Sequence, residues 1–224
     1  MHSGVLIGDA KGVSVENVRV YNNQIEVLSI GISLWRNALI DYNAWLKSVE
    51  IYNNSIRITD GPSFNNRKLG INCSVSRNTS NIYVYNNNIE ILTSEIKSTG
   101  IYFGSTMTNE KLDKLYISNN TILNFTFGVS NGDLQKGELG EISITNNHIN
   151  NSLTTIYSTY GIRFIREKRN SLRKVIIKEN LIQNINYGVY LKGYINSLDY
   201  NKSDTIINSI SEFIHQNLQI EQVL

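Results

Sequence analysis

Cysteine and proline are scarce in this chain of 224 residues, and no sign of charge dominates. The single cysteine, Cys73, excludes an intrachain disulfide. The net charge is only +2, from 21 basic and 19 acidic residues, so we expect neither nucleic acid nor a membrane surface as partner. No apolar run reaches the roughly 18 residues of a transmembrane helix. The first residues also lack the basic and apolar regions of a signal peptide, so the sequence itself does not indicate a location.

Asparagine and isoleucine are instead the two most frequent residues. Asparagine tolerates the left-handed backbone conformation of tight turns. Isoleucine favours strands with one buried face. Together they indicate a chain of many short strands joined by tight corners.

A phrase of alternating apolar residues followed by two polar residues recurs six times. Val18-Arg-Val-Tyr-Asn-Asn-Gln-Ile25 and Ile82-Tyr-Val-Tyr-Asn-Asn-Asn-Ile89 are two examples. The alternation predicts strands with one buried face, and the polar pair predicts a corner whose second residue takes a positive φ. We expect the second Asn of every phrase to form one hydrogen-bonded ladder along the stacked corners. The ladder residues are Asn23, Asn54, Asn87, Asn120, Asn147 and Asn180.

A second phrase, glycine followed by a branched apolar residue, any residue and usually another apolar residue, follows each of these corners. Gly100-Ile-Tyr-Phe103 and Gly188-Val-Tyr-Leu191 are examples. One such coil cannot bury its own apolar residues, so coils must stack. The repeat predicts an all-β fold: a right-handed parallel β-helix of about six coils over residues 1–203. Apolar residues at helical spacing predict a C-terminal capping helix over 204–224, with an irregular extra coil as the alternative.

These two motifs resemble the pectin-lyase-like family of right-handed β-helices, which includes pectate lyases, polygalacturonases and phage tailspikes. The resemblance covers residues 4 to about 195 and implies a polysaccharide partner, bound near the Gly-Ile strand. It also implies an extracellular or virion-surface location. The family's catalytic patterns are absent, because the chain has no Asp-Asp pair and no Gly-His-Gly segment. Its single proline, Pro62, also lacks flanking arginines.

The candidate binding residues lie at the variable position of the Gly-Ile phrase, which should face outward, and in two loops. Aromatic rings can stack on sugars, and a guanidinium matches a uronate carboxylate. In a lyase, Arg163 is the best-placed base. The acidic residues near this face, Asp60, Asp133 and Glu167, are scattered singly, so we expect no metal site and no cofactor. The predicted carbohydrate-binding residues are Trp35, Arg36, Asn72, Tyr102, Arg163, Arg166 and Tyr190.

Each of these features also has a purely structural interpretation. The outward column fits a generic polar face, Trp35 and Trp45 fit a loop folded onto the helix, and the basic run at 163–174 fits a solvated loop. Cys73 is expected to be buried, and Asn131, at a position that is apolar in other coils, to shorten its strand.

Two functions of different classes therefore compete. The first is a polysaccharide-binding or polysaccharide-processing β-helix, lyase-like if catalytic. The second is a non-catalytic structural or adhesive module, such as a segment of a trimeric tailspike or surface fibre. Because Gly4–Ile7 resembles the second half of a coil, further coils are expected upstream, or a partner at that end.

Overall fold

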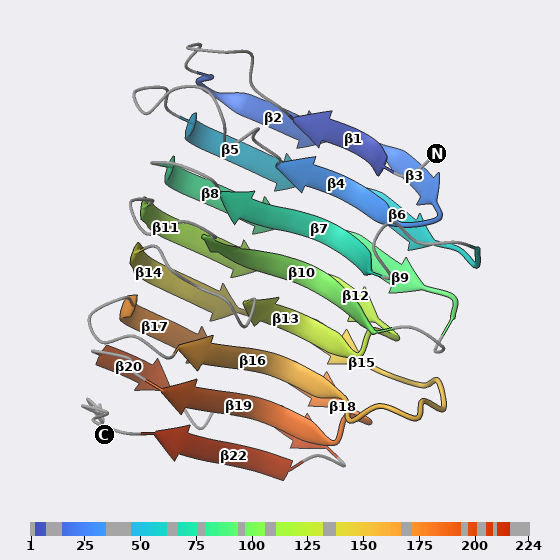
Figure 1. Cartoon of the computed structure of the whole chain (residues 1–224), viewed down its shortest axis with the longest axis vertical. Helices are drawn as coiled ribbons and strands as arrows, with labels where there is room; N and C mark the ends of the chain where they lie inside the picture. The colour runs from blue at the N-terminus through green and yellow to red at the C-terminus, as the bar shows by residue number, and fades with distance from the viewer. Residues whose placement is uncertain are drawn as a thin grey trace.

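Three parallel β-sheets wind into one solenoid in the computed structural model (Figure 1). The structure describes residues 3–7, 15–34, 46–61, 67–75, 79–93, 97–105, 111–131, 138–166, 172–193, 197–200, 205–207 and 210–215. Every strand pair described between neighbouring coils is parallel, as between β1 and β4 or β16 and β19, which confirms the all-β parallel solenoid predicted from the repeat. Among the described residues, no helix has the length and apolar character needed to span a membrane.

Sheet A contains the strands of the Gly-Ile phrase and has eight members. They run in sequence order from one end of the solenoid to the other, as the blue-to-red series of Figure 1 shows. These strands are β1 (Ser3–Ile7), β4 (Ile30–Leu34), β7 (Lys68–Val75), β10 (Ser98–Ser105), β13 (Phe127–Asn131), β16 (Tyr160–Arg166), β19 (Tyr187–Gly193) and β22 (Ile210–His215).

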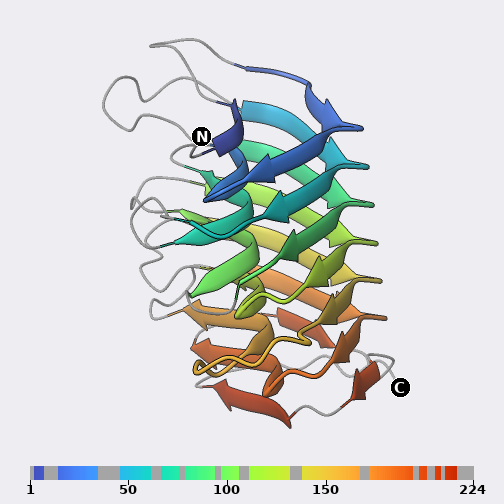
Figure 2. The same cartoon turned by 90° about the vertical axis from the view of Figure 1, so that its right-hand side faces the viewer.

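Sheets B and C contain the strands before and after the Asn corner, seven in each. Figure 2 shows the stacked coils from the side. Sheet B comprises β2 (Val18–Tyr21), β5 (Leu46–Tyr52), β8 (Thr79–Tyr85), β11 (Lys111–Ser118), β14 (Glu138–Thr145), β17 (Leu172–Lys178) and β20 (Ser197–Tyr200). Sheet C comprises β3 (Gln24–Val27), β6 (Ser55–Ile58), β9 (Asn88–Ile91), β12 (Thr121–Leu123), β15 (His148–Asn150), β18 (Leu181–Gln183) and β21 (Thr205–Ile207).

The predicted Asn ladder is present at the corner between sheets B and C. Each ladder residue donates from Nδ2 to Oδ1 of the Asn in the next coil, at 2.9–3.0 Å, from Asn23 through to Asn180. The same amides also bond to backbone carbonyls, as in the 2.9 Å bond from Asn87 to Ile51. The ladder therefore satisfies the polar groups of a buried corner.

The positive φ at this corner belongs to the first residue of each pair, so the prediction for the second residue is wrong. Asn53 and Asn119 have φ of 54°, and Glu179 takes the equivalent position in its coil with φ 58°. The side chain of the second residue points into the ladder, whereas the first residue makes the turn and is exposed.

Glycine is required near the start of the sheet A strands because neighbouring atoms leave no room for a side chain there. A Cβ on Gly31 would lie 2.3 Å from Ile56 Cγ2 and 2.5 Å from the Gly70 carbonyl oxygen. On Gly100 the corresponding distances are 2.3 Å to Ile122 Cγ2 and 2.7 Å to the Gly128 oxygen. The recurring glycine thus lets two backbones and a core isoleucine approach one another.

Inward side chains from all three sheets form one continuous apolar core. The predicted inward residues of the Gly-Ile phrase are all buried, with 3% or less of each exposed. These residues are Ile32, Leu34, Ile71, Cys73, Ile101, Phe103, Ile162, Phe164, Val189 and Leu191. Phe103 and Phe164 contact each other across the interior, with ring centroids 5.3 Å apart.

The helix predicted for 204–224 is wrong wherever the structure describes this segment. Residues 205–207 form β21, which pairs with β18, and 210–215 form β22, which pairs with β19. Ile206 lies beside the inward-facing Ile182, and Phe213 lies beside Leu191. A short apolar run fits strand and helix periodicity alike, and pairing with the preceding coil favours the strand.

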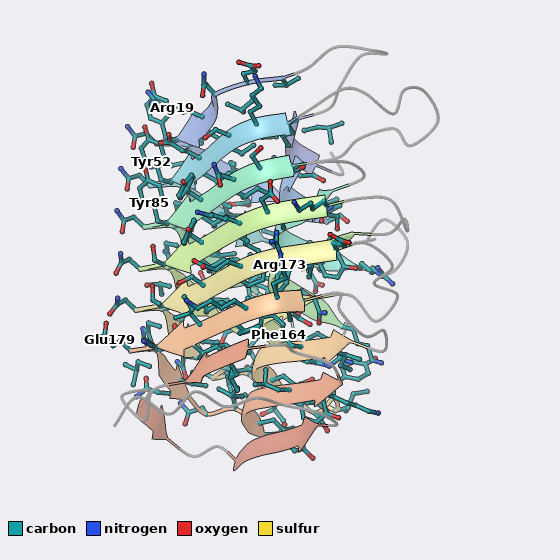
Figure 3. All side chains as sticks on the ribbon, turned by 90° about the vertical axis from the view of Figure 1, so that its left-hand side faces the viewer. Arg19, Tyr52, Tyr85, Phe164, Arg173 and Glu179 are labelled. Atoms are coloured by element: carbon teal, nitrogen blue, oxygen red, sulfur yellow. The ribbon has the colours of Figure 1, made fainter. Side chains whose placement is uncertain are left out.

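Tyrosine ladders cover part of the outer face of sheet B. Tyr21, Tyr52 and Tyr85 stack in succession with centroids 5.1 and 4.9 Å apart, and Tyr83 stacks on Tyr116 at 5.1 Å. Figure 3 shows Tyr52 and Tyr85 projecting from the side of the solenoid. These contacts stabilise the stacking of coils in addition to the backbone pairing, because an aromatic pair contributes more free energy than the burial of its surface alone.

Candidate functional site

The outward column predicted on sheet A exists in the predicted register. Asn72 lies beside Tyr102, Tyr102 beside Ser130, Ser130 beside Arg163, and Arg163 beside Tyr190. Asn72, Tyr102, Arg163 and Tyr190 are half-buried, while Ser130 is only 2% exposed. The column is therefore not equally accessible to solvent along its length. A ligand could reach it only at its larger, half-buried side chains.

The two ends of this column differ in chemistry. Toward the N-terminus, Asn72 donates to Ser33 Oγ at 3.1 Å and accepts from the Ser74 amide at 3.0 Å, so its amide already has protein partners. Toward the C-terminus, Arg163 and Tyr190 lie among aromatic rings. The aromatic end is therefore the better candidate for ligand contact.

An aromatic stack occupies the outer position just before the glycine in three successive coils. Phe127 and Tyr160 have ring centroids 5.4 Å apart, and Tyr160 and Tyr187 are 4.8 Å apart. Tyr190 meets both tyrosines edge-on, at 5.4 and 6.1 Å. Because Tyr160 is stacked on both faces, a ligand could contact its ring edge but not a ring face.

Arg163 lies over this stack. Its guanidinium carbon is 5.0 Å from the Phe127 centroid and 5.7 Å from the Tyr160 centroid, which is cation–π range. A guanidinium remains protonated in proteins. The rings therefore hold a permanent positive charge on the outer face of sheet A.

A pocket of about 320 Å³ opens beside the stack. Its described lining combines Phe127, Tyr160 and Arg163 with Lys97 and the segment 156–158. Thr126 completes the described lining. Because Lys97 precedes β10 and residues 156–158 precede β16, the pocket spans three successive coils.

The segment 151–159, between β15 and β16, contributes Ile156, Tyr157 and Ser158 to the pocket lining and is the gold loop at the right of Figure 1. Asn124 Oδ1 accepts from the Ser152 amide at 3.0 Å and from its hydroxyl at 2.9 Å. At the other end, Asn186 Oδ1 accepts from the Thr159 amide at 2.8 Å. These three bonds connect the segment to residues outside it. Lys97 Nζ lies 5.7 Å from the centroid of the Tyr157 ring.

Several predicted site residues are not among the described residues that line this pocket. Trp35 and Arg36 lie outside the part of the chain that the structure describes, as does most of their loop. Arg166 is the last residue of β16 and pairs with Gly193. Tyr102 belongs to the same column as Arg163 but is separated from it by the coil that contains Ser130.

The described part of the site contains no acid–base pair. The described residues lining the pocket include no carboxylate, and the described residues contain no group of three or more His, Cys, Asp or Glu placed to hold a metal ion. Asp60 is instead 3.8 Å from the buried Lys68, while Asp133 and Glu167 lie outside the described residues. The arrangement suits binding better than acid–base chemistry.

Sequence reasoning missed the residues that give this site its character. Phe127, Tyr160 and Tyr187 directly precede the glycine in three consecutive coils, and this aromatic-Gly pattern was available in the sequence. Lys97 and Tyr157 had no such signal, because their positions depend on how two corner segments fold.

Two core positions of the Gly-Ile phrase hold unusual residues. Asn131 is the last residue of β13, and its side chain both donates to and accepts from the backbone of Ile165, at 2.8 Å each. β13 is no shorter than β4, which has Leu34 at this position, so the predicted shortening of the strand stays a prediction. Cys73 is completely buried, and burial raises the pKa of its thiol to about 12. Its surroundings therefore make it a structural residue rather than a nucleophile.

No protein-family model, curated protein or solved structure matches this chain.

Proposed function

We propose that this chain is a glycan-binding β-helix module that binds its polysaccharide on the outer face of sheet A, across β10, β13, β16 and β19. The observation that carries the proposal is the juxtaposition of Arg163, the Phe127–Tyr160–Tyr187 stack and the adjoining pocket. Ring edges, phenolic hydroxyls and a fixed guanidinium together supply apolar contact and hydrogen-bond donors for a sugar surface.

The column geometry supports the proposal. Coils stack about 4.8 Å apart, so a polysaccharide lying along the solenoid axis can contact several coils in succession. The resemblance of the Asn corner and the Gly-Ile strand to pectin-lyase-like β-helices supports a polysaccharide as an analogy only, because one fold carries many functions. If the module also cleaves its glycan, Arg163 is the candidate catalytic residue of a lyase reaction, in which its guanidinium would pair with the carboxylate next to the proton that is removed.

A panel of purified neutral and acidic polysaccharides tests this proposal, with binding measured by affinity electrophoresis. Retardation by at least one polysaccharide is expected. The same incubations, followed by ultraviolet absorbance of unsaturated products, distinguish a lyase from a binding module. Absence of retardation by every member of the panel would contradict the proposed function.

The second candidate is a non-catalytic structural or adhesive module, such as a fibre segment that assembles as a homotrimer. The observation that favours it is the uninterrupted Asn ladder from Asn23 to Asn180, together with the tyrosine ladders of sheet B. These repeated contacts stiffen a rod and need no ligand. Sedimentation showing a trimer, combined with an empty polysaccharide panel, would favour this candidate.

A further inference from the structure

Two tyrosine pairs on the outer face of sheet B share one arrangement. Tyr85 stacks on Tyr52 with ring centroids 4.9 Å apart and ring planes 3° apart, and Tyr116 stacks on Tyr83 at 5.1 Å and 8°. The members of each pair are direct partners in the parallel register of neighbouring coils, so backbone pairing holds the two rings together. All four side chains are half-buried, which leaves part of each ring open to solvent.

Each pair has a carboxylate at one of its phenols. The Tyr85 hydroxyl donates to Glu50 Oε2 and the Tyr116 hydroxyl donates to Glu141 Oε1, both at 3.4 Å. A tyrosine normally has a pKa of about 10, and burial together with the adjacent carboxylate raises the pKa of both phenols. Both are therefore protonated at neutral pH and must release a proton when they lose an electron. The carboxylate can accept that proton, and its negative charge favours removal of the electron.

We propose that Tyr52–Tyr85 and Tyr83–Tyr116 are oxidative cross-linking sites, at which a peroxidase-type one-electron oxidant joins neighbouring coils through dityrosine. The first cross-link connects β5 to β8, and the second connects β8 to β11. The two bonds together would fasten three successive coils on the face opposite to none of the glycan-contact residues, since those residues lie on sheet A. The inference is therefore independent of the proposed glycan binding.

Coupling at the first pair removes two electrons and two protons. Tyr85 loses one electron to the oxidant and its hydroxyl proton to Glu50, and Tyr52 loses one electron to the oxidant and its hydroxyl proton to water. The two tyrosyl radicals then form a carbon–carbon bond between their ortho carbons. The hydrogen on each of these carbons moves as a proton to the phenoxyl oxygen, which restores two phenols. Hydrogen peroxide, as the terminal oxidant, takes up the two electrons and two protons and becomes two molecules of water.

The positions of the side chains suit this reaction. Because the rings lie on the outer face of the sheet, they can tilt toward each other without disturbing the core. Tyr52 also stacks on Tyr21, at 5.1 Å, but the phenol with a carboxylate beside it is Tyr85. The radical should therefore form first at Tyr85 and couple with its stacked neighbour. At the second pair, Tyr116 and Glu141 take the same roles.

A tyrosine pair on sheet A provides an internal comparison. Tyr160 and Tyr187 stack at 4.8 Å, as closely as the pairs on sheet B. The guanidinium carbon of Arg163 lies 5.7 Å from the Tyr160 centroid. A permanent positive charge at this distance disfavours loss of an electron from the ring. If proximity alone decided the reaction, this pair would cross-link as readily as the others, whereas the charges predict a lower yield.

The test is to oxidise the full chain at low concentration with a haem peroxidase and hydrogen peroxide, and to isolate the monomer. We expect dityrosine fluorescence, the loss of two hydrogen atoms from the intact mass for each cross-link, and tryptic peptides joined through the predicted pairs. Trypsin separates all the residues concerned, because Tyr52, Tyr116 and the segment containing Tyr83 and Tyr85 lie between different basic residues. Peptides joined through Tyr160 and Tyr187 should be less abundant.

Glu50→Gln tests the role of the carboxylate, with Arg19→Gln as the matched control. Arg19 Nε lies 3.5 Å from Glu50 Oε1, so either variant removes this ion pair, but only Glu50→Gln removes the proton acceptor of Tyr85. Glu50→Gln should slow formation of the Tyr52–Tyr85 cross-link by at least about tenfold, since a positioned base often contributes more than that. Arg19→Gln should not slow it. Equal melting temperatures before oxidation establish that both variants fold normally.

Three results would overturn the inference. The first is a monomer without dityrosine after oxidation. The second is a set of joined peptides in which Tyr21–Tyr52 or Tyr160–Tyr187 equals or exceeds the predicted pairs. The third is the same rate of cross-linking in Glu50→Gln and Arg19→Gln. None of these results bears on the polysaccharide panel, so failure here and failure of the proposed function are separate findings.

Discussion

Asn87 donates its side-chain amide to Asn120 Oδ1 at 2.9 Å, and the Asn120 oxygen also accepts from the Asn87 backbone amide at 3.0 Å. One side-chain oxygen thus serves two donors of the preceding coil, and this arrangement repeats at every step of the ladder. The contact fixes the vertical register of the coils, because a slip by one residue would leave both donors unpaired in the interior.

Asn87→Leu should destabilise the protein by roughly 3–5 kcal/mol, since several buried donors and acceptors lose their partners and each costs about 1–3 kcal/mol. Denaturant unfolding measures the loss. Asn23→Leu is the matched control at the end of the ladder: Asn23 is half-buried, and the loss there should be about 1 kcal/mol. Equal losses at both positions would contradict the ladder as the source of the stability.

Glu179→Asn should stabilise the protein by about 0.5–1 kcal/mol. Glu179 has φ of 58°, a conformation that asparagine tolerates better than glutamate. Figure 3 shows Glu179 at the outer edge of the solenoid, so its replacement leaves the core intact. Thermal unfolding measures the gain, and the reverse exchange in the preceding coil, Asn146→Glu, should lower the melting temperature. A lower melting temperature for Glu179→Asn would contradict the assignment.

Gly100→Ala should cost about 3 kcal/mol, the upper part of the usual range for overpacking. The new methyl group would lie 2.3 Å from Ile122 and 2.7 Å from the backbone oxygen of Gly128, and the backbone oxygen cannot move without disturbing the next coil. Urea unfolding gives the measurement. An alanine variant as stable as the unmodified protein would show that the corner between sheets C and A is wider than described.

Stability should fall between about pH 9 and pH 12 through Cys73. Burial raises the pKa of its folded-state thiol to about 12, whereas an unfolded thiol titrates nearer 9. A raised folded-state pKa means that the contribution is complete below the unfolded value and is lost as pH rises toward the folded value. Each pH unit in this window removes up to about 1.4 kcal/mol. Comparison with Cys73→Ala isolates this effect, because the alanine variant should lack that part of the pH slope.

The sequence was sufficient to predict the scaffold, because the side-chain requirements of the ladder and of the core recur at fixed positions. It was not sufficient for the conformation of the corner, because both residues of the pair are usually Asn. In the structure it is the first residue of each pair that has the positive φ, Glu179 included. At the C-terminus, the short apolar run containing Ile206 and Phe213 fitted both periodicities, and only pairing with β18 and β19 distinguishes them.

The candidate site was predicted in part. The column containing Tyr102, Arg163 and Tyr190 followed from alternation, which is a local property of a strand. The pocket did not, because Lys97 and Tyr157 come together from segments of two coils whose paths no repeat specifies. The sequence also does not show that Phe127 and Tyr187 cover both faces of the Tyr160 ring, so the surface that this ring presents could not be predicted.

The central claim is that glycan contact occurs on the outer face of sheet A, and calorimetric titration with a polysaccharide that binds in the panel tests it most directly. The double variant Tyr102→Ala/Arg163→Ala is compared with Tyr83→Ala/Arg19→Ala, which removes one tyrosine and one arginine from the outer face of sheet B. We expect the sheet A variant to lose about 1–3 kcal/mol of binding free energy, the scale of an interface anchor, while the sheet B variant binds normally. Unchanged binding by the sheet A variant, at an unchanged melting temperature, would contradict the claim.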